Sequence, residues 1–129
     1  MRTLILGAIV TLTSSAQDLE QFTRARPEHI IVEVAHPFRV RAVAGIVVLK
    51  GEGVPIPKVL LEIQGPDGTK KIRHAISGED GHFQFRHISA GTYRFKATLD
   101  GMQSVMGTIE VVKKGESDQE IRIEMAFGV

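Results

Sequence analysis

The sequence predicts an all-β protein, a seven-stranded antiparallel Greek-key β-sandwich. From Phe38 onward, short β-prone runs alternate with Gly, Pro and Asp, and evenly spaced strands with turn signals are typical of sandwiches and barrels. Within most runs, apolar and polar residues alternate with a period of two, which gives a strand one buried and one wet face. The expected strands span 39–49, 58–64, 69–76, 82–86, 92–98, 102–112 and 119–126.

The alternation also assigns individual side chains to the two faces of a strand. In 58–64, Leu61 and Ile63 share one face and Glu62 lies on the other. In 92–98, Phe95 faces inward and Lys96 faces outward. We therefore expect Glu62 and Lys96 on the wet side of the sandwich.

One expected strand breaks the alternation, because the run VRAVAGIVVL at 40–49 is apolar on both faces. An exposed apolar row of that length would promote aggregation, so something should cover it. The first candidate is the preceding segment HIIVEV with Phe22 and Phe38, and the second is a partner protein. The possible partner-contact face consists of Val40, Ala42, Ala44, Ile46 and Val48.

The N-terminal residues have the layout of a secretory signal peptide. A basic residue at position 2 is followed by an apolar run and by small residues before Ala16. We expect residues 1–16 to be a signal peptide, 17–37 a leader with a possible extra strand at 29–34, and 38–129 the sandwich domain. This organisation predicts a secreted or periplasmic protein with no transmembrane segment after signal cleavage, since the apolar run is too short to span a bilayer.

Composition excludes several classes of function. The chain has 129 residues, room for one domain with a modest core, and a formal net charge of +1. This balance gives no reason to expect nucleic-acid binding. The absence of cysteine rules out a disulfide framework, a thiol nucleophile and a cysteine zinc site.

The stretch SGEDGHFQF at 77–85 combines two carboxylates with a histidine and could suggest chemistry. Glu79 and Asp80 are adjacent, whereas a calcium loop spaces its carboxylates at alternate positions. The glycines and Asp80 fit a hairpin tip, with Phe83 and Phe85 entering the core. No G-x-S-x-G or H-E-x-x-H motif occurs. We therefore expect no catalytic residue, metal site or cofactor.

Ordered motifs along the chain are similar to those of a known family. VAGIVVLKGEGVPIP is followed by the turn and two-phenylalanine strand, then by GTYRF and LDGM. Together they resemble the carboxypeptidase regulatory-like domain, of the transthyretin-like or prealbumin-like β-sandwich group, over roughly residues 42–126. The resemblance implies an Ig-like, transthyretin-like fold and a non-catalytic module. The matching residues are Gly45, Val47, Gly53, Pro55, Ile56, Pro57, Ser77, Asp80, Gly81, Phe83, Phe85, Gly91, Tyr93, Phe95 and Gly101.

The expected function is therefore that of an exported, non-enzymatic module that binds a partner or has a structural role in the cell envelope. Its partner would be a protein or a glycan of the envelope, reached through loops, a strand edge or an apolar patch. The alternative is a carbohydrate-binding module. That alternative requires exposed aromatic residues, and the candidates are Phe22, Phe38 and Phe127.

Overall fold

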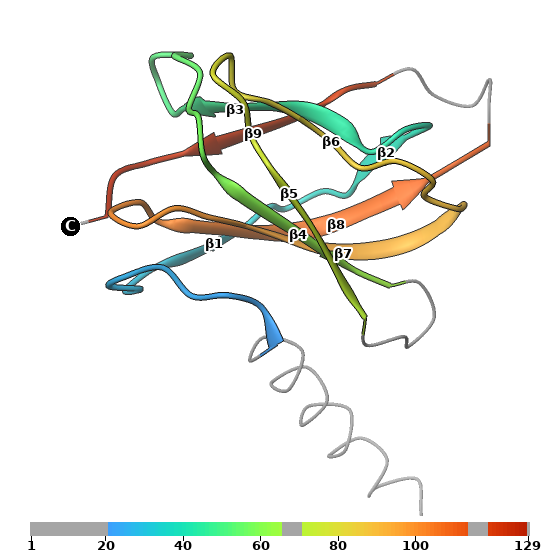
Figure 1. The fold of residues 1–129 in the computed structure, drawn as a ribbon, viewed down its shortest axis with the longest axis horizontal. Helices are drawn as coiled ribbons and strands as arrows, with labels where there is room; N and C mark the ends of the chain where they lie inside the picture. The colour runs from blue at the N-terminus through green and yellow to red at the C-terminus, as the bar shows by residue number, and fades with distance from the viewer. Residues whose placement is uncertain (1–20, 66–70, 114–118, 129) are drawn as a thin grey trace, which may run out of the picture.

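The computed structural model describes residues 21–65, 71–113 and 119–128, and the expected signal peptide lies outside these ranges. Two sheets face one another, the smaller one uppermost in Figure 1. In the described residues, no helix is both long and apolar enough to cross a membrane. The strands are β1 (Ile31–Glu33), β2 (Phe38–Val40), β3 (Ala44–Leu49), β4 (Leu60–Gln64), β5 (Ile72–Ile76), β6 (His82–Gln84), β7 (Gly91–Thr98), β8 (Ser104–Val111) and β9 (Ile121–Met125).

The predicted all-β sandwich is confirmed, with two differences in detail. The larger sheet has the order β1-β8-β7-β4-β5, with β2 also paired to β8, and the smaller sheet has the order β6-β3-β9. The described residues thus form nine strands instead of seven. The sheets are also mixed instead of purely antiparallel, because β1 and β2 run parallel to β8 and β3 runs parallel to β9.

The expectation of one continuous strand over 39–49 is wrong. β2 ends at Val40 and pairs with β8 in the larger sheet, whereas β3 begins at Ala44 and pairs with β6 and β9 in the smaller one. Residues 41–43 carry the chain between the sheets, and both Val40 and Val43 are buried in the core. The run is apolar on both faces because its two halves face the core from different sheets.

The strand expected at 29–34 is present as β1, and together with β2 it lines one edge of β8. Glu33 is opposite Met106 and Phe38 is opposite Ile109. Between these two pairs, the segment that contains β1 and β2 is five residues long, whereas β8 covers the same distance in three residues. The two extra residues form a bulge around Pro37. A proline is tolerated at such an interruption because no ladder hydrogen bond is lost there.

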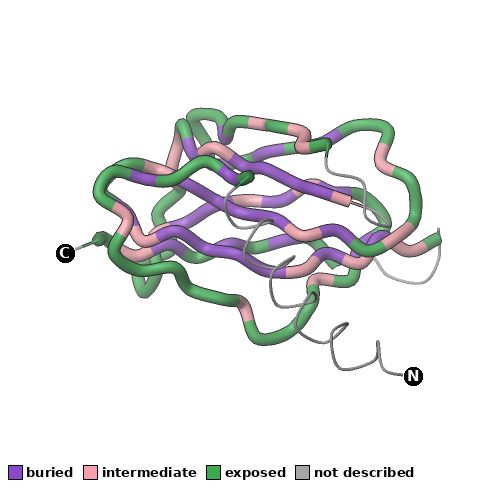
Figure 2. Tube along the Cα trace, turned by 90° about the horizontal axis from the view of Figure 1, so that it is seen from below, coloured by how far each residue is buried: buried purple, intermediate pink, exposed green. Residues whose placement is uncertain are grey.

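The core lies between the two sheets and is closely packed. The rings of Phe38 and Phe95 lie 5.9 Å apart between their centroids. A side chain at Gly107 would collide with the Phe95 ring, and one at Gly45 would collide with the backbone carbonyl of Ile121. Figure 2 shows buried residues along the central strands and exposed residues in the connections.

The stretch at 77–85 forms the expected tight turn. The N–H of Gly78 donates to the carbonyl of His82, and Gly81 has a φ of 79° that favours glycine. The turn does not join two paired strands, however. It leads from β5 in the larger sheet to β6 in the smaller sheet, so it is a crossover between layers and not a hairpin tip.

Candidate functional site

The outer face of the larger sheet is covered by the chain's own N-terminal residues. Residues 21–30, which we call the N-terminal strap, run beneath this sheet on the side away from the smaller one (Figure 1). Glu62 on β4 is directly opposite Lys96 on β7, and both residues are 1% exposed. Their assignment to the outer face is correct, but the expectation that this face is wet is wrong.

Lys96 is neutralised by a carboxylate of the strap. Lys96 Nζ lies 2.8 Å from Glu28 Oε2, and Ser104 Oγ donates to the same oxygen at 2.6 Å. Burial raises the pKa of Glu28, but the hydrogen bonds from Lys96, Ser104 and the backbone N–H of Ala25 outweigh it, so the pKa lies below its ordinary value. The arrangement is a paired buried charge, which needs all its partners in place.

Glu62 is held by a second set of strap contacts. Its carboxylate accepts hydrogen bonds from the N–H of Thr23 at 2.9 Å and from Thr23 Oγ1 at 3.1 Å. His74 Nε2 on β5 lies 3.4 Å from Glu62 Oε2. Within the described residues, no buried side-chain nitrogen or oxygen lacks a hydrogen-bond partner. These polar groups therefore fix the strap in place.

Beyond the strap, β1 is tied to the sheet by an ion pair. Arg94 Nη1 and Nη2 donate to the two carboxylate oxygens of Glu33 at 2.7 and 3.0 Å. The Arg94 hydrogen bonds lower the pKa of Glu33 below its usual value. Two parallel hydrogen bonds of this kind also fix orientation, so the side chain of Glu33 points to the outer face of the larger sheet.

The outer face of the smaller sheet is open. His82 and Gln84 on β6 and Arg122 and Glu124 on β9 are all exposed along its two sides. Ile46 on β3 lies between them, opposite His82 on one side and Arg122 on the other. We call this surface the open face and define it by Ala44, Ile46, His82, Gln84, Arg122 and Glu124.

The five residues of the possible partner-contact face do not lie together on one surface of the structure. Val40 is in the core, Ala42 is exposed in the crossover, and Val48 is buried where it pairs with Pro55. Only Ala44 and Ile46 are half-buried and accessible on the open face. The expected cover by HIIVEV is also wrong, because β1 and the strap lie on the larger sheet.

A hollow adjoins the open face where the edges of the two sheets meet. Ile76, at the end of the edge strand β5, is 65% exposed on its rim. Across the hollow lie the edge strand β6 and the start of β3. Its lining is mixed, with apolar and polar side chains from both sheets: Ala44, Gly45, Ile76, Gly78, His82, Phe83, Gln84 and Glu120.

Of the residues considered for chemistry, Asp80 and His82 form an exposed pair, which belongs to no larger cluster of possible metal ligands among the described residues. His82 Nδ1 lies 3.2 Å from Asp80 Oδ2, but both side chains are more than half exposed. The backbone N–H of His82 is the main cause that lowers the pKa of Asp80. His74 is engaged by Glu62 instead, and no cluster of three or more potential metal ligands occurs among the described residues.

Sequence reasoning missed the residues of the strap. Thr23 and Glu28 lie in a polar stretch with few apolar residues, which has no periodicity to place it. The one signal was on the sheet, where Lys96 stands in the middle of a long strand between Phe95 and Ala97. A lysine at such a position indicates either solvent or a buried partner, and the sequence does not separate the two.

The fold and its surfaces define a two-layer β-sandwich module with one self-covered face and one open face. The family described as the carboxypeptidase regulatory-like domain matches residues 42–125, and the chain belongs to this family. A search of curated proteins finds no match. The family match begins after β2, so the strap and β1 precede the part of the chain that the family covers.

Proposed function

We propose that this chain is an exported, non-enzymatic module that binds a partner or has a structural role in the cell envelope. Membership of the carboxypeptidase regulatory-like family supports a β-sandwich interaction module. The buried ionisable groups support it too, because Glu28, Glu62 and Lys96 are engaged in contacts that hold the strap against the larger sheet. Export is supported by the signal-peptide pattern of residues 1–16.

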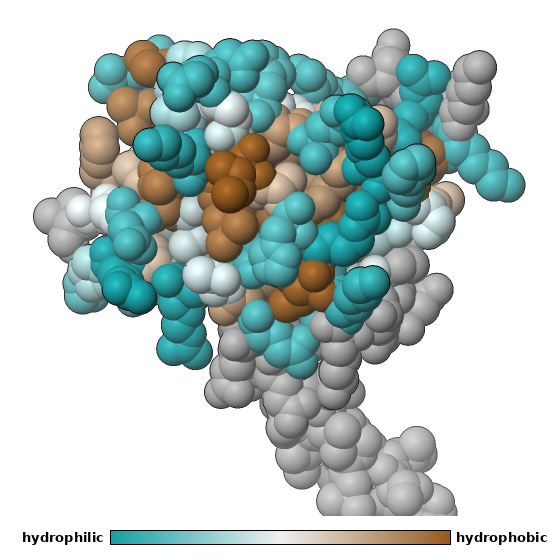
Figure 3. Space-filling view, in the orientation of Figure 1, coloured by the Kyte–Doolittle hydropathy of each residue, from teal (hydrophilic) through white to brown (hydrophobic). Residues whose placement is uncertain are grey.

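The open face is the observation that carries the proposal. The outer face of the larger sheet is covered by the strap, whereas the smaller sheet has Ala44 and Ile46 accessible between polar flanks. An apolar centre with a polar rim is the usual anatomy of a protein interface. The hollow with Ile76 on its rim extends this surface toward β5. In Figure 3, apolar patches are interspersed with polar residues on the face that is visible.

A photo-crosslinking residue at Ile46 in the exporting cell tests this surface. We expect Ile46 to crosslink to one envelope protein. The same residue at Val54, which is exposed but lies outside the open face, should not crosslink to that protein. Absence of any adduct at Ile46, or equal adducts at both positions, would contradict the proposal. The mass of the mature protein tests export separately, since cleavage after Ala16 leaves Gln17 at the N-terminus.

The glycan alternative has little support from its aromatic candidates. Phe22 is buried under the larger sheet and Phe38 packs against Phe95, so only Phe127 of the three is exposed. One ring does not form a platform for a sugar chain. A protein partner is therefore the occupant that we propose for the open face.

A further inference from the structure

A second surface stands out at the far edge of the larger sheet. Ile30, directly before β1, and Ile31 and Val32 within it are consecutive apolar residues that are 45%, 43% and 40% exposed. β1 ends the strand order of its sheet. Three consecutive apolar residues on an edge strand form a template for pairing with another strand.

The backbone of β1 is arranged for such pairing. Ser104 N–H donates to the carbonyl of Ile30, and Val34 N–H donates to the carbonyl of Met106. A parallel ladder uses alternate residues of each strand, so the even-numbered residues of β1 bond to β8. The N–H and C=O groups of His29, Ile31 and Glu33 therefore point away from β8, toward solvent.

Charged side chains occur along two of the other edge strands, β5 and β9, whereas Ile31 and Val32 of β1 are apolar. The opposite edge of the same sheet, β5, has Arg73 and His74 and is preceded by Lys71. On the smaller sheet, β9 carries Arg122 and Glu124. Charged side chains are the usual protection of an edge against pairing. In β1 the only charged residue is Glu33, and its side chain is turned onto Arg94.

We propose that two copies of this chain pair antiparallel through β1, about a two-fold axis at Ile31. In this register Ile31 meets Ile31 of the second copy, and the two residues exchange both backbone hydrogen bonds. His29 then lies opposite Glu33 of the second copy, and Ile30 lies opposite Val32. The segment HIIVE is therefore complementary to itself when reversed, with a basic and an acidic end around three apolar residues. A two-fold interface requires this self-complementarity.

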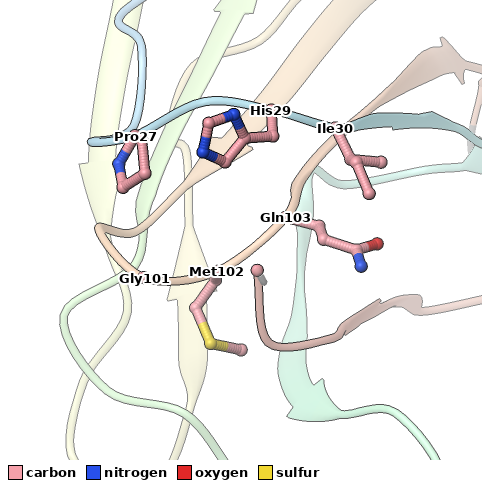
Figure 4. Close-up of a pocket in the computed structure, with 7 residues that line it drawn as sticks. Pro27, His29, Ile30, Gly101, Met102 and Gln103 are labelled. Atoms are coloured by element: carbon pink, nitrogen blue, oxygen red, sulfur yellow. The ribbon is translucent and has the colours of Figure 1, made fainter.

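Apolar surface continues from the edge toward the end of the sandwich. Ile30 lines a small cavity with Pro27 and Met102 beside Gln103 (Figure 4). Gln103 Nε2 donates to the backbone carbonyl of Phe127. The residue Phe127 is itself 64% exposed. A second copy aligned on β1 would lie next to this surface, which would enlarge the contact beyond five residues of backbone pairing. The pairing leaves the open face free in both copies, so it is independent of the proposed function.

Disulfide trapping with Ile31→Cys tests the register. The chain has no cysteine, and the Cα atoms of a hydrogen-bonded antiparallel pair lie about 5.5 Å apart, within disulfide range. Under mild oxidation we expect Ile31→Cys to form a covalent dimer at least about tenfold faster than Val54→Cys, an exposed control outside β1. Equal rates for the two variants would overturn the proposal.

The effect of Ile31→Pro on self-association tests the same edge without a covalent bond. The backbone N–H of Ile31 points away from β8. Proline at this position therefore removes the donor of the intermolecular hydrogen bond and leaves the hydrogen bonds between β1 and β8 intact. In sedimentation velocity, we expect the unaltered protein to form a dimer as its concentration rises. The Ile31→Pro variant should stay monomeric, and its circular dichroism spectrum should match that of the unaltered protein. A protein that stays monomeric, or a dimer that persists in the folded Ile31→Pro variant, would refute pairing through β1.

Discussion

Lys96 on β7 and Glu28 in the strap are 68 residues apart in sequence, yet their charged groups lie 2.8 Å apart with 2% and 10% of their side chains exposed. The sandwich therefore includes a strap that is outside the family match and is held by a buried charge pair. A hydrophobic core between the two sheets and a polar cluster outside the larger sheet stabilise the fold together.

Removing one member of the buried pair should destabilise the protein strongly. Glu28→Ala leaves the Lys96 ammonium buried without a counter-charge, which costs about 3–5 kcal/mol. Urea denaturation measures the loss, and Glu120→Ala, at an exposed position, is the matched control with little expected effect. The double variant Glu28→Leu, Lys96→Met should recover much of the lost stability, because apolar replacement of a whole buried pair is often neutral. A single variant as stable as the control would contradict the burial of this charge.

Acid should weaken the attachment of the strap and of β1 to the larger sheet. Glu28 and Glu33 both have pKa values below the ordinary 4.5 in the folded protein. Their stabilisation is therefore present above about pH 4.5 and is lost as the pH falls through the lower folded values. We expect the urea midpoint to decrease over this range in the unaltered protein. In Glu28→Leu, Lys96→Met the decrease should be smaller, and an identical acid dependence would show that the pair does not contribute.

Gly45 should tolerate no side chain. An added Cβ would lie against the carbonyl carbon of Ile121 at 2.7 Å, where β3 and β9 run parallel. Gly45→Ala should therefore disrupt this pairing and lower the thermal midpoint. Gly78→Ala is the control, because its Cβ would meet Asp80 Oδ1 at 3.5 Å, an ordinary contact. Equal midpoints for the two variants would indicate a different β3–β9 register.

Two neighbouring positions on β3 should respond differently to lysine. Val48 is 1% exposed, so Val48→Lys would bury an unpaired charge and should cost several kcal/mol. Ile46 is half-buried on the open face, and a long side chain there can extend its ammonium into water. Ile46→Lys should change the unfolding free energy by less than about 1 kcal/mol. Comparable losses in both variants would mean that the open face is covered.

The sequence predicts core residues correctly in strands where apolar and polar residues alternate and turn residues mark both ends. The pattern assigns Phe83, Phe85 and Phe95 to a core face, and each of them is buried. The alternation predicts which residues share a face, but it does not tell whether that face meets water or another segment. Glu62 shows this limit, because its outer face is covered by a strap without periodicity.

The division of the run at 40–49 was not predictable from the same pattern. A continuous apolar run is expected for a strand buried on both faces and also for a chain that passes from one sheet to another. Val40 and Val47 both face the core, one from each sheet. The sequence pattern therefore places Val40, Ala42, Ala44, Ile46 and Val48 on one face of a single strand. In the structure, only Ala44 and Ile46 of these five residues are accessible on the open face.

The most direct test of the strap as part of the domain is urea denaturation of two chains, one beginning at residue 21 and the other at residue 35. The shorter chain keeps β2 and the family match but lacks the strap and β1. We expect it to lose cooperative unfolding or to unfold at a much lower urea concentration, because Lys96, Ser104 and Met106 lose their cover. Equal midpoints for the two chains would contradict this account.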